Sequence, residues 1–188
     1  ATGMADGTPW SFDFSLVTAP EGQPATQTVT NENPTLTWTG LVPGEQYTLT
    51  EQAASGWTPG ALTCTVGGAA LADLDGKADA SITFEAPLDV STTFDVVCSM
   101  TNTAAKGALT IEKTSVGGDG TFGFTLTPTT GTVLTGSVTT QDGTGTTTID
   151  GLVPGMAYVL TETPDPHWIN GEITCTVTHA DETTDTYS

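Results

Sequence analysis

Runs in which every second residue is apolar recur along this chain and predict β-strands. Phe12, Phe14 and Leu16 share one parity, as do Tyr47 and Leu49 further on. A strand has a period of two residues, so side chains of one parity lie on the same face of a sheet. The other runs that predict strands in this way are residues 36–38, 62–66, 82–84, 94–102 and 109–113.

Turn signals separate these runs. Residues 41–44 read Leu-Val-Pro-Gly, in which the proline fixes φ and the glycine takes the positive φ of a type II turn. The chain is rich in threonine, glycine and proline, a composition that favours strands and turns over helices. Short strands separated by turns predict an all-β antiparallel sandwich.

The same set of landmarks occurs twice. Residues 12–16 match residues 122–126 at an offset of 110. Further landmarks recur at an offset of 111. Residues 40–44, Tyr47, Trp57 and Cys64 correspond to residues 151–155, Tyr158, Trp168 and Cys175. A repeat of this size predicts an array of similar modules. Such arrays more often provide reach or cross-linking than chemistry.

We predict two sandwich modules, residues 1–104 and 105–188. The second opens with a strand at residues 107–114, whereas the first begins almost at its Phe-x-Phe strand, and an ungapped alignment places Lys113 on Gly3. We therefore expect module 1 to lack its first strand and module 2 its last. One explanation is a window cut from a longer repeat, and the alternative is strand donation by neighbouring subunits.

The charge balance is strongly acidic. Aspartate and glutamate number 22 against three lysines and no arginine, a formal charge of −19. This charge argues against nucleic acid and anionic membrane surfaces as partners, because little here could neutralise phosphates. No run approaches the 18 apolar residues of a membrane-spanning helix, so no membrane insertion is expected in this segment.

Polar side chains stand where the alternation expects apolar ones. They are Lys113, Glu162 with its repeat equivalent Glu51, and Asn102. Each should point towards the core at the end of its strand, where a lone charge is unfavourable unless it is paired or neutralised. A desolvated lysine becomes a nucleophile and a buried glutamate can move protons. An asparagine carboxamide is an electrophile that such a lysine could attack, which would release ammonia and leave an amide cross-link.

Several segments together resemble the prealbumin-fold (CnaB-like, SpaA-type) modules of Gram-positive surface proteins and pilins. These segments are residues 98–103, 109–113, 117–122, 152–155 and 158–162. The resemblance implies tandem antiparallel Ig-like or prealbumin-like β-sandwich modules. In many such modules a first-strand lysine joins a last-strand asparagine through an isopeptide bond, assisted by the glutamate of a Tyr-x-Leu-x-Glu strand.

By that resemblance, Glu51 would be the proton shuttle and Asn102 the acceptor in module 1. Lys113 would be the nucleophile and Glu162 the shuttle in module 2. Neither set of three is expected to be complete within residues 1–188. The alternative is an edge-exposed lysine, with the glutamates and the asparagine as ordinary hydrogen-bonded strand ends.

The cysteines predict a disulfide. Cys64 and Cys98 lie at inward parity on strands predicted to be neighbours, which favours a Cys64–Cys98 bond over two buried thiols. Cys175 is the repeat equivalent of Cys64, and its partner is expected beyond the chain. Disulfides indicate an oxidising, extracellular setting.

Signals for cofactors are weak. Asp73, Asp75 and Asp79 surround Gly76 and could offer oxygen ligands to Ca²⁺, but their spacing departs from the EF-hand, and a solvated acidic turn is the simpler interpretation. The histidines and cysteines follow no metal-ligand spacing. No phosphate loop or nucleophile elbow occurs, so we expect no cofactor and no enzyme activity.

We interpret the chain as a structural segment of an extracellular bacterial protein, a stalk, fibre or cell-surface scaffold of an adhesin. Its expected partners are neighbouring modules or copies of itself, or a host or matrix surface. One alternative is a filament subunit whose chains complete each other's sandwiches. A second is a ligand-binding adhesin module with Trp57 and Trp168 exposed as contacting groups.

Overall fold

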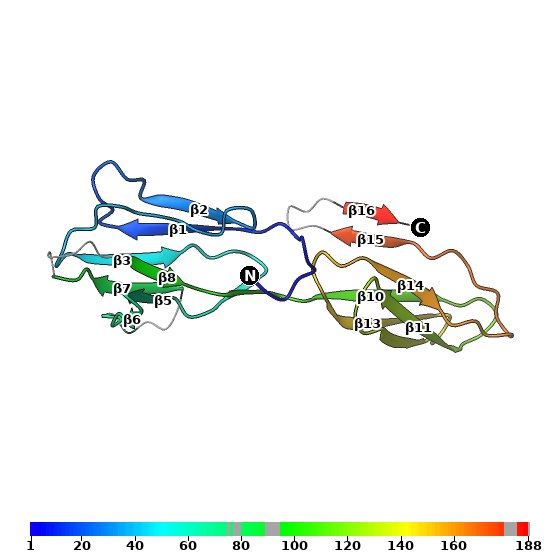
Figure 1. Cartoon of the computed structure of the whole chain (residues 1–188). Helices are drawn as coiled ribbons and strands as arrows, with labels where there is room; N and C mark the ends of the chain where they lie inside the picture. Colours follow the sequence, from blue (N-terminus) through cyan, green and yellow to red (C-terminus); the bar gives the residue numbers. More distant parts are fainter. Residues whose placement is uncertain (75, 77–79, 89–94, 179–183, 188) are drawn as a thin grey trace. The chain divides into compact units, whose positions relative to one another are not determined.

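The computed structural model describes residues 1–74, 76, 80–88, 95–178 and 184–187, and it places sixteen β-strands and no helix in them (Figure 1). The predicted all-β fold is confirmed. This described part of the chain accordingly contains no long apolar helix of the kind that spans a membrane. Phe94, Asp75, Asp79 and His179 lie outside the described residues.

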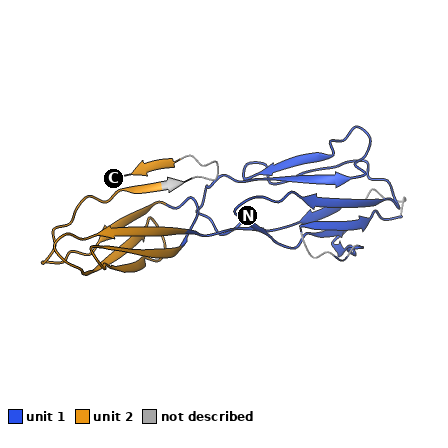
Figure 2. Ribbon diagram, turned by 180° about the vertical axis from the view of Figure 1, so that it is seen from behind, with its two compact units in different colours: residues 1–107, 151–156 blue, residues 108–150, 157–188 orange. Residues whose placement is uncertain are grey.

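The chain divides into two compact units (Figure 2). Unit 1 comprises Ala1–Gly107 with Gly151–Met156, and unit 2 comprises Ala108–Asp150 with Ala157–Ser188. Each unit contains several antiparallel sheets, as expected of a sandwich module.

The larger sheet of unit 1 has the order β2-β1-β3-β7. Its strands are β1 (Ser11–Val17), β2 (Thr26–Thr30), β3 (Gln46–Glu51) and β7 (Ser81–Glu85). All neighbours are antiparallel, and the register places Phe14 opposite Glu51 and Tyr47 opposite Phe84. The predicted strands at residues 12–16, 47–51 and 82–84 are thus neighbours in one sheet.

The remaining strands of unit 1 form two smaller sheets. One has the order β6-β5-β8 and the other pairs β4 with β9. These strands are β4 (Trp57–Pro59), β5 (Thr63–Val66), β6 (Ala69–Ala70), β8 (Val96–Ser99) and β9 (Asn102–Ala104). The buried core joins Leu16, Tyr47 and Phe84 of the larger sheet to Leu62 and Cys64 beside it. Apolar side chains from facing layers therefore hold the unit together, mainly through the hydrophobic effect.

Unit 2 repeats part of this arrangement. One sheet has the order β12-β11-β14, and β10 pairs with β13 and β15 with β16. The strands are β10 (Gly107–Thr114), β11 (Thr121–Pro128), β12 (Leu134–Thr139), β13 (Thr144–Leu152), β14 (Tyr158–Glu162), β15 (Cys175–Thr178) and β16 (Thr184–Tyr187). Phe124 lies opposite Glu162, as Phe14 lies opposite Glu51 in unit 1.

The run at residues 94–102 is not one strand, and the expectation of a single strand there was wrong. β8 pairs with β5, whereas β9 pairs with β4. Between them the carbonyl oxygen of Thr101 accepts a hydrogen bond from the Gly60 amide at 2.9 Å. Cys98 and Met100 are half-buried and Asn102 is buried, so the inward parity continues while the chain changes its partner.

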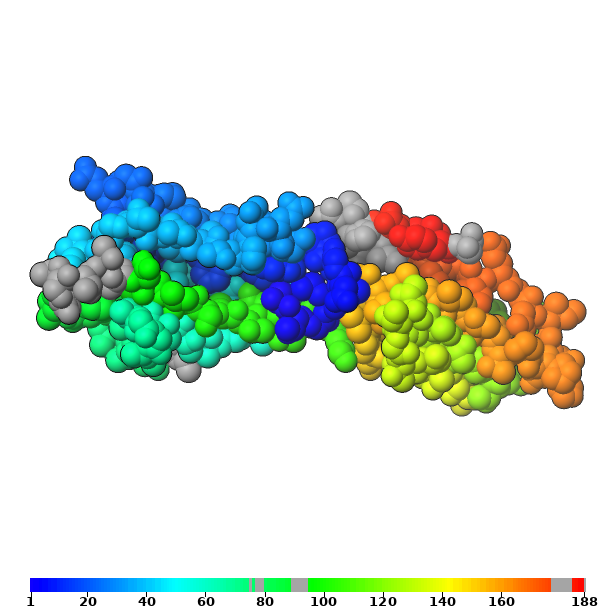
Figure 3. All heavy atoms as spheres, in the orientation of Figure 1, coloured from blue at the N-terminus to red at the C-terminus, as the bar shows by residue number. Residues whose placement is uncertain are grey.

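The second difference concerns residues 33–42, which lie outside every strand, although residues 36–38 were predicted to form one. Their counterparts in unit 2, residues 144–153, include the whole of β13, whose backbone partner is β10. In unit 1 side chains hold the middle of the segment, since Trp38 Nε1 donates to the Pro24 carbonyl at 2.8 Å and Gln27 Nε2 to the Thr37 carbonyl at 3.0 Å. Residues 33–42 lie along the surface of unit 1 (Figure 3).

Candidate functional site

Two of the predicted site residues meet in unit 1. Glu51 ends β3 and Asn102 begins β9, and each residue is only 6% exposed. Tyr47 and Leu49 precede Glu51 at the same parity and are buried with it, so the apolar face of the strand carries the carboxylate inward. Asn102 Nδ2 donates a hydrogen bond to Glu51 Oε1.

This environment changes the ionisation of Glu51. Burial raises the pKa of the Glu51 carboxyl above its ordinary value, and the hydrogen bond from Asn102 lowers it to a smaller extent. The other end of the carboxamide is unsatisfied, because Asn102 Oδ1 is buried and has no hydrogen-bond partner among the described residues. Such an orphaned acceptor is rare in folded proteins and needs a physical explanation.

A cavity of about 130 Å³ adjoins this pair. Phe12 and Trp57 contribute aromatic walls and Ala53 contributes a small side chain, while Glu51 and Asn102 line the same space. The cavity is therefore apolar along its sides, with a carboxylate and a carboxamide as its polar groups. Phe12 and Trp57 pack edge to face, with ring centroids 5.0 Å apart.

The other two predicted residues meet in unit 2. Lys113 Nζ lies 2.9 Å from both carboxylate oxygens of Glu162. The side chains are 17% and 5% exposed, so the ion pair is largely removed from water. Lys113 Nζ also lies 4.5 Å from the ring centroid of Phe122, within the range of a cation–π contact.

The two sites share one frame. Phe122 packs on Trp168 with centroids 5.1 Å apart, as Phe12 packs on Trp57. In unit 2 this frame contains the lysine ammonium, whereas in unit 1 the corresponding space is the cavity beside Glu51. Each site thus brings together two of the predicted residues, Glu51 with Asn102 and Lys113 with Glu162.

Sequence reasoning missed the phenylalanines and tryptophans of this frame as parts of the site. Their recurrence beside the repeated Tyr-x-Leu-x-Glu strand was the available signal. Trp57 and Trp168 are half-buried and pack edge to face on phenylalanine rings. This packing weakens the interpretation of the two tryptophans as exposed ligand-contacting groups.

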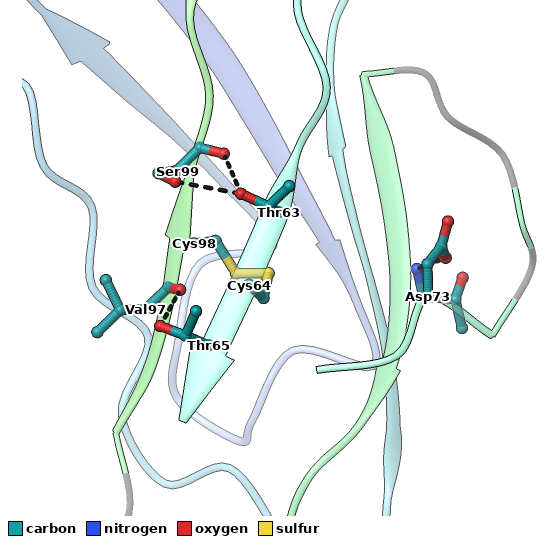
Figure 4. Close-up of a disulfide and its surroundings, with 8 residues drawn as sticks. Thr63, Cys64, Thr65, Asp73, Val97, Cys98 and Ser99 are labelled. Carbon is teal, nitrogen blue, oxygen red and sulfur yellow. Dashed lines mark hydrogen bonds between the residues drawn. A yellow bond between two sulfur atoms is a disulfide. The ribbon is translucent and has the colours of Figure 1, made fainter. Parts of the chain in front are cut away.

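The predicted disulfide is present in the structure. Cys64 of β5 and Cys98 of β8 lie directly opposite each other and are bonded, with their Cα atoms 4.0 Å apart (Figure 4). Thr63 Oγ1 lies 3.3 Å from Ser99 Oγ, and Thr65 Oγ1 donates to the Val97 carbonyl at 3.4 Å. The disulfide therefore links neighbouring strands of one sheet rather than the two layers of the sandwich.

The repeat equivalent of Cys64 has different surroundings. Cys175 is a half-buried free thiol at the start of β15. Its register partner on β16 is Tyr187, whereas the partner of Cys64 is Cys98. The expected disulfide of Cys175 involves a residue outside the chain and stays a prediction.

The described residues offer no group of three or more histidine, cysteine or acidic side chains suited to a metal ion. Asp73 is exposed, and one of its carboxylate oxygens accepts a hydrogen bond from the Thr83 amide at 3.2 Å. This contact fastens the chain before β7 to the strand itself. Asp75 and Asp79, the other members of the suggested calcium site, lie outside the described residues.

Comparison with known proteins gives one positive result. A family model described as a prealbumin-like fold domain, of the SpaA type, matches residues 2–104 and matches again over residues 109–188. The two matches cover nearly the whole chain, one for each of the repeated segments. Neither a curated protein nor a solved structure matches the chain.

Proposed function

The chain belongs to the SpaA-type prealbumin-like fold domain family, and from this premise we propose that it is a structural module array of an extracellular bacterial surface protein. It would act as a stalk, fibre or adhesin scaffold whose partners are neighbouring modules, copies of itself, or a host or matrix surface. The Cys64–Cys98 disulfide supports an oxidising location. The charge of −19 suits a soluble surface that repels its own copies.

The main support for the proposal is that the same glutamate of the repeat, Glu51 in unit 1 and Glu162 in unit 2, has a different partner in each unit. Glu51 contacts an asparagine, and Glu162 contacts a lysine within the same aromatic frame. These are the acceptor half and the nucleophile half of a lysine–asparagine cross-link. Where the third group is supplied, each module would be locked by an amide bond that resists unfolding and proteolysis.

The proposed chemistry is a self-modification rather than turnover. The lysine amine attacks Cγ of the asparagine, a new C–N bond forms, and the bond to Nδ2 breaks. The buried glutamate carries a proton from the amine to the departing nitrogen, which leaves as ammonia. The protein is consumed as its own substrate, so it is not expected to be an enzyme.

Peptide mapping by mass spectrometry without reductant, on protein from its natural source, tests this function. We expect a Cys64–Cys98 peptide pair, and peptides of Lys113 and Asn102 each joined to another peptide with the loss of one ammonia. Matched Glu162→Ala and Glu51→Ala variants, expressed in the same source, should lose the amide cross-link of their own unit and keep the disulfide. Unmodified Lys113 and Asn102 in the natural protein would refute the cross-linking account.

A filament subunit with strand complementation is the second candidate function. Residues 33–42 favour it, because they alternate like a strand and yet lie outside every strand, whereas their counterparts in unit 2 pair with β10. Such a segment presents backbone donors and acceptors to an incoming strand.

A further inference from the structure

The loop between β14 and β15 (Figure 1) contains an aspartate–proline bond. Of the 11 prolines in the sequence, only Pro166 follows an aspartate, and a histidine comes next. The Trp168 amide donates to the Asp165 carbonyl at 3.1 Å, so residues 165–168 form a β-turn. Asp165 is half-buried, and Pro166 and His167 are exposed. The aspartate–proline bond therefore opens a turn that solvent reaches.

The Asp165 carboxylate is held by the residue two positions further on. Its Oδ1 accepts a hydrogen bond from the His167 amide at 2.8 Å and lies 2.9 Å from His167 Nδ1. Because an ionised carboxylate only accepts hydrogen bonds, the second contact requires Nδ1 to carry a proton. The backbone hydrogen bond, and then the side-chain one, hold the pKa of the Asp165 carboxyl below its ordinary value. A carboxylate and a protonated nitrogen thus lie side by side.

The equivalent turn of unit 1 shows that the fold does not require these residue types. At an offset of 111, residues 165–168 correspond to residues 54–57, which read Ala-Ser-Gly-Trp. The Trp57 amide donates to the Ala54 carbonyl at 3.2 Å, the same backbone hydrogen bond as in unit 2. The tryptophan packs on a phenylalanine in both units. The aspartate, proline and histidine of unit 2 are therefore an addition to a turn that forms without them.

An aspartate that precedes proline has a restricted chemistry. Before other residues, the next backbone N–H can attack the aspartate side chain and close a succinimide, but Pro166 has no N–H. The intramolecular reaction that remains runs in the opposite direction, from the Asp165 carboxylate to its own backbone carbonyl carbon, and closes a five-membered ring. A proline nitrogen favours this reaction, because a tertiary amide nitrogen is more basic than a secondary one and leaves more readily once protonated.

The turn supplies the groups that such an attack needs. The hydrogen bonds of the Asp165 carboxylate within the described part of the chain all go to Oδ1, which leaves Oδ2 as the nucleophile. The Trp168 amide polarises the carbonyl under attack and stabilises the negative charge that develops on its oxygen. His167 Nδ1 carries a proton for the departing nitrogen.

We propose that the Asp165–Pro166 bond is a self-cleavage site, at which unit 2 activates the Asp165 carbonyl group for transfer to a primary amine of another molecule. The carboxylate oxygen bonds to the carbonyl carbon, the bond to the Pro166 nitrogen breaks, and that nitrogen takes a proton from His167. Residues 1–165 then end in a cyclic aspartyl anhydride. A primary amine opens the anhydride to an amide and a carboxylate and releases one proton. Water competes and gives two carboxylates.

The reaction requires two charged groups at once, the carboxylate and the imidazolium. The charged side chain in contact with Asp165 is His167, and the neighbouring carboxylate of Glu162 is engaged by Lys113. Cleavage is therefore fastest in mildly acidic solution, where histidine becomes protonated while this aspartate stays ionised. This inference is independent of the lysine–asparagine cross-link, because neither that lysine nor that asparagine takes part.

The test follows the intact mass of the full chain at about pH 5.5, where histidine side chains are largely charged, and at about pH 8, where they are neutral. We expect fragments of residues 1–165 and 166–188, formed about 10-fold faster at the lower pH. Hydroxylamine serves as the amine probe, and fragment 1–165 should then end in a hydroxamate of Asp165. A chain unfolded in urea at the lower pH is the control, and it should stay intact over the same time.

The outcomes of this experiment separate the two parts of the proposal. An intact chain at both pH values would overturn self-cleavage. Equal rates in the folded and the unfolded chain would also overturn it, because the turn would then contribute nothing. Fragments that form without any hydroxamate would overturn the transfer to amines. The equivalent bond between Ala54 and Ser55 is an internal control and should stay intact throughout.

Variants assign the roles within the turn. Asp165→Asn keeps an acceptor for the His167 amide but lacks the nucleophile, so it should abolish cleavage. His167→Asn keeps a side-chain N–H but does not titrate, and it should slow cleavage about 100-fold and remove the pH dependence. The turn of unit 1 forms with Ala-Ser-Gly, so both variants should fold, which unchanged hydrogen exchange in β11 and β14 would verify. Cleavage that persists in Asp165→Asn would overturn the mechanism.

Discussion

Units 1 and 2 place the same carboxylate in the same aromatic frame, and the group opposite determines what the carboxylate does. Glu162 faces a lysine ammonium and forms an ion pair, whereas Glu51 faces a neutral carboxamide beside a cavity. The strand and its apolar neighbours fix the position of the acid. The residue that contacts it comes from another strand, Lys113 in unit 2 and Asn102 in unit 1.

The equivalent strands β3 of unit 1 and β14 of unit 2 also differ, in how deeply their side chains are buried. Tyr47 and Leu49 are 2% and 7% exposed because β7 pairs with β3 and its side chains pack in the same core. Their counterparts Tyr158 and Leu160 on β14 are only half-buried, in a sheet of three strands among the described residues. Equal sequence patterns are thus buried to different degrees by what lies beside them.

The largest effect that separates the units should come from the disulfide. The bond closes a sequence separation of 34 residues in unit 1, so replacing Cys64 and Cys98 together by alanine should destabilise that unit by about 4 kcal/mol on the chain-entropy description. Chemical denaturation followed by hydrogen exchange reads the units separately. β1 and β3 should lose protection while β11 and β12 keep it, and Cys175→Ala is the control with no effect on unit 1. Equal losses in both units would contradict this assignment.

A glutamate-to-glutamine change should have opposite consequences in the two sites. Glu162→Gln removes the charge that Lys113 contacts and should destabilise unit 2 by about 2 kcal/mol, typical of a charged hydrogen bond. Glu51→Gln removes a buried charge but keeps an acceptor for Asn102, so unit 1 should be as stable or more stable at neutral pH. Denaturation midpoints of the two variants give the comparison, and a loss in both would contradict it.

The pH profile of Glu51→Gln sharpens this contrast. The pKa of Glu51 is raised above its ordinary value of 4.5, so the folded state binds more protons than the unfolded state in the window above 4.5. The contribution of Glu51 to stability is therefore fully present below that pH and is lost as the pH rises through the folded-state pKa. The difference between wild type and Glu51→Gln isolates this slope from the other acidic groups, and a difference independent of pH would argue against it.

The smallest expected difference concerns the aromatic face beneath the lysine. Phe122→Leu combined with Lys113→Met should show a coupling of about 1 kcal/mol, the usual range for a partly buried cation–π contact. Phe12→Leu should show no coupling with Lys113→Met, because Phe12 faces the cavity of unit 1. A double-mutant cycle in urea measures both values, and equal coupling energies would rule out a specific contact.

The sequence predicted more of the site than of the strand pairing around it. Period-two alternation correctly placed Glu51, Asn102 and Glu162 inward, because inward parity depends only on neighbours along one strand. It could not show that the run at residues 94–102 changes partners at Thr101, or that residues 33–42 lack a ladder. Backbone pairing depends on which strand lies alongside, and local alternation holds no information about that.

The same limit applies to the cavity. Phe12 and Trp57 are separated by 45 positions and meet because residues of β1, β3 and β4 line the same cavity. The sequence repeat showed that the two modules share these aromatic residues. The volume beside Glu51 arises because the described residues supply no side chain equivalent to Lys113, which is evident only when the two sites are compared in space.

The position of the disulfide also has a mechanical consequence. A tensile force along the backbone crosses from β5 to β8 through the sulfur atoms, so the chain between Cys64 and Cys98, which includes β7, carries no load. With a separation of 34 residues, this withholds roughly 120 Å of contour length from extension. Under tension, the segment between the two cysteines would therefore stay unextended. Because β7 lies in that segment, it could pair with β3 again once the force is removed.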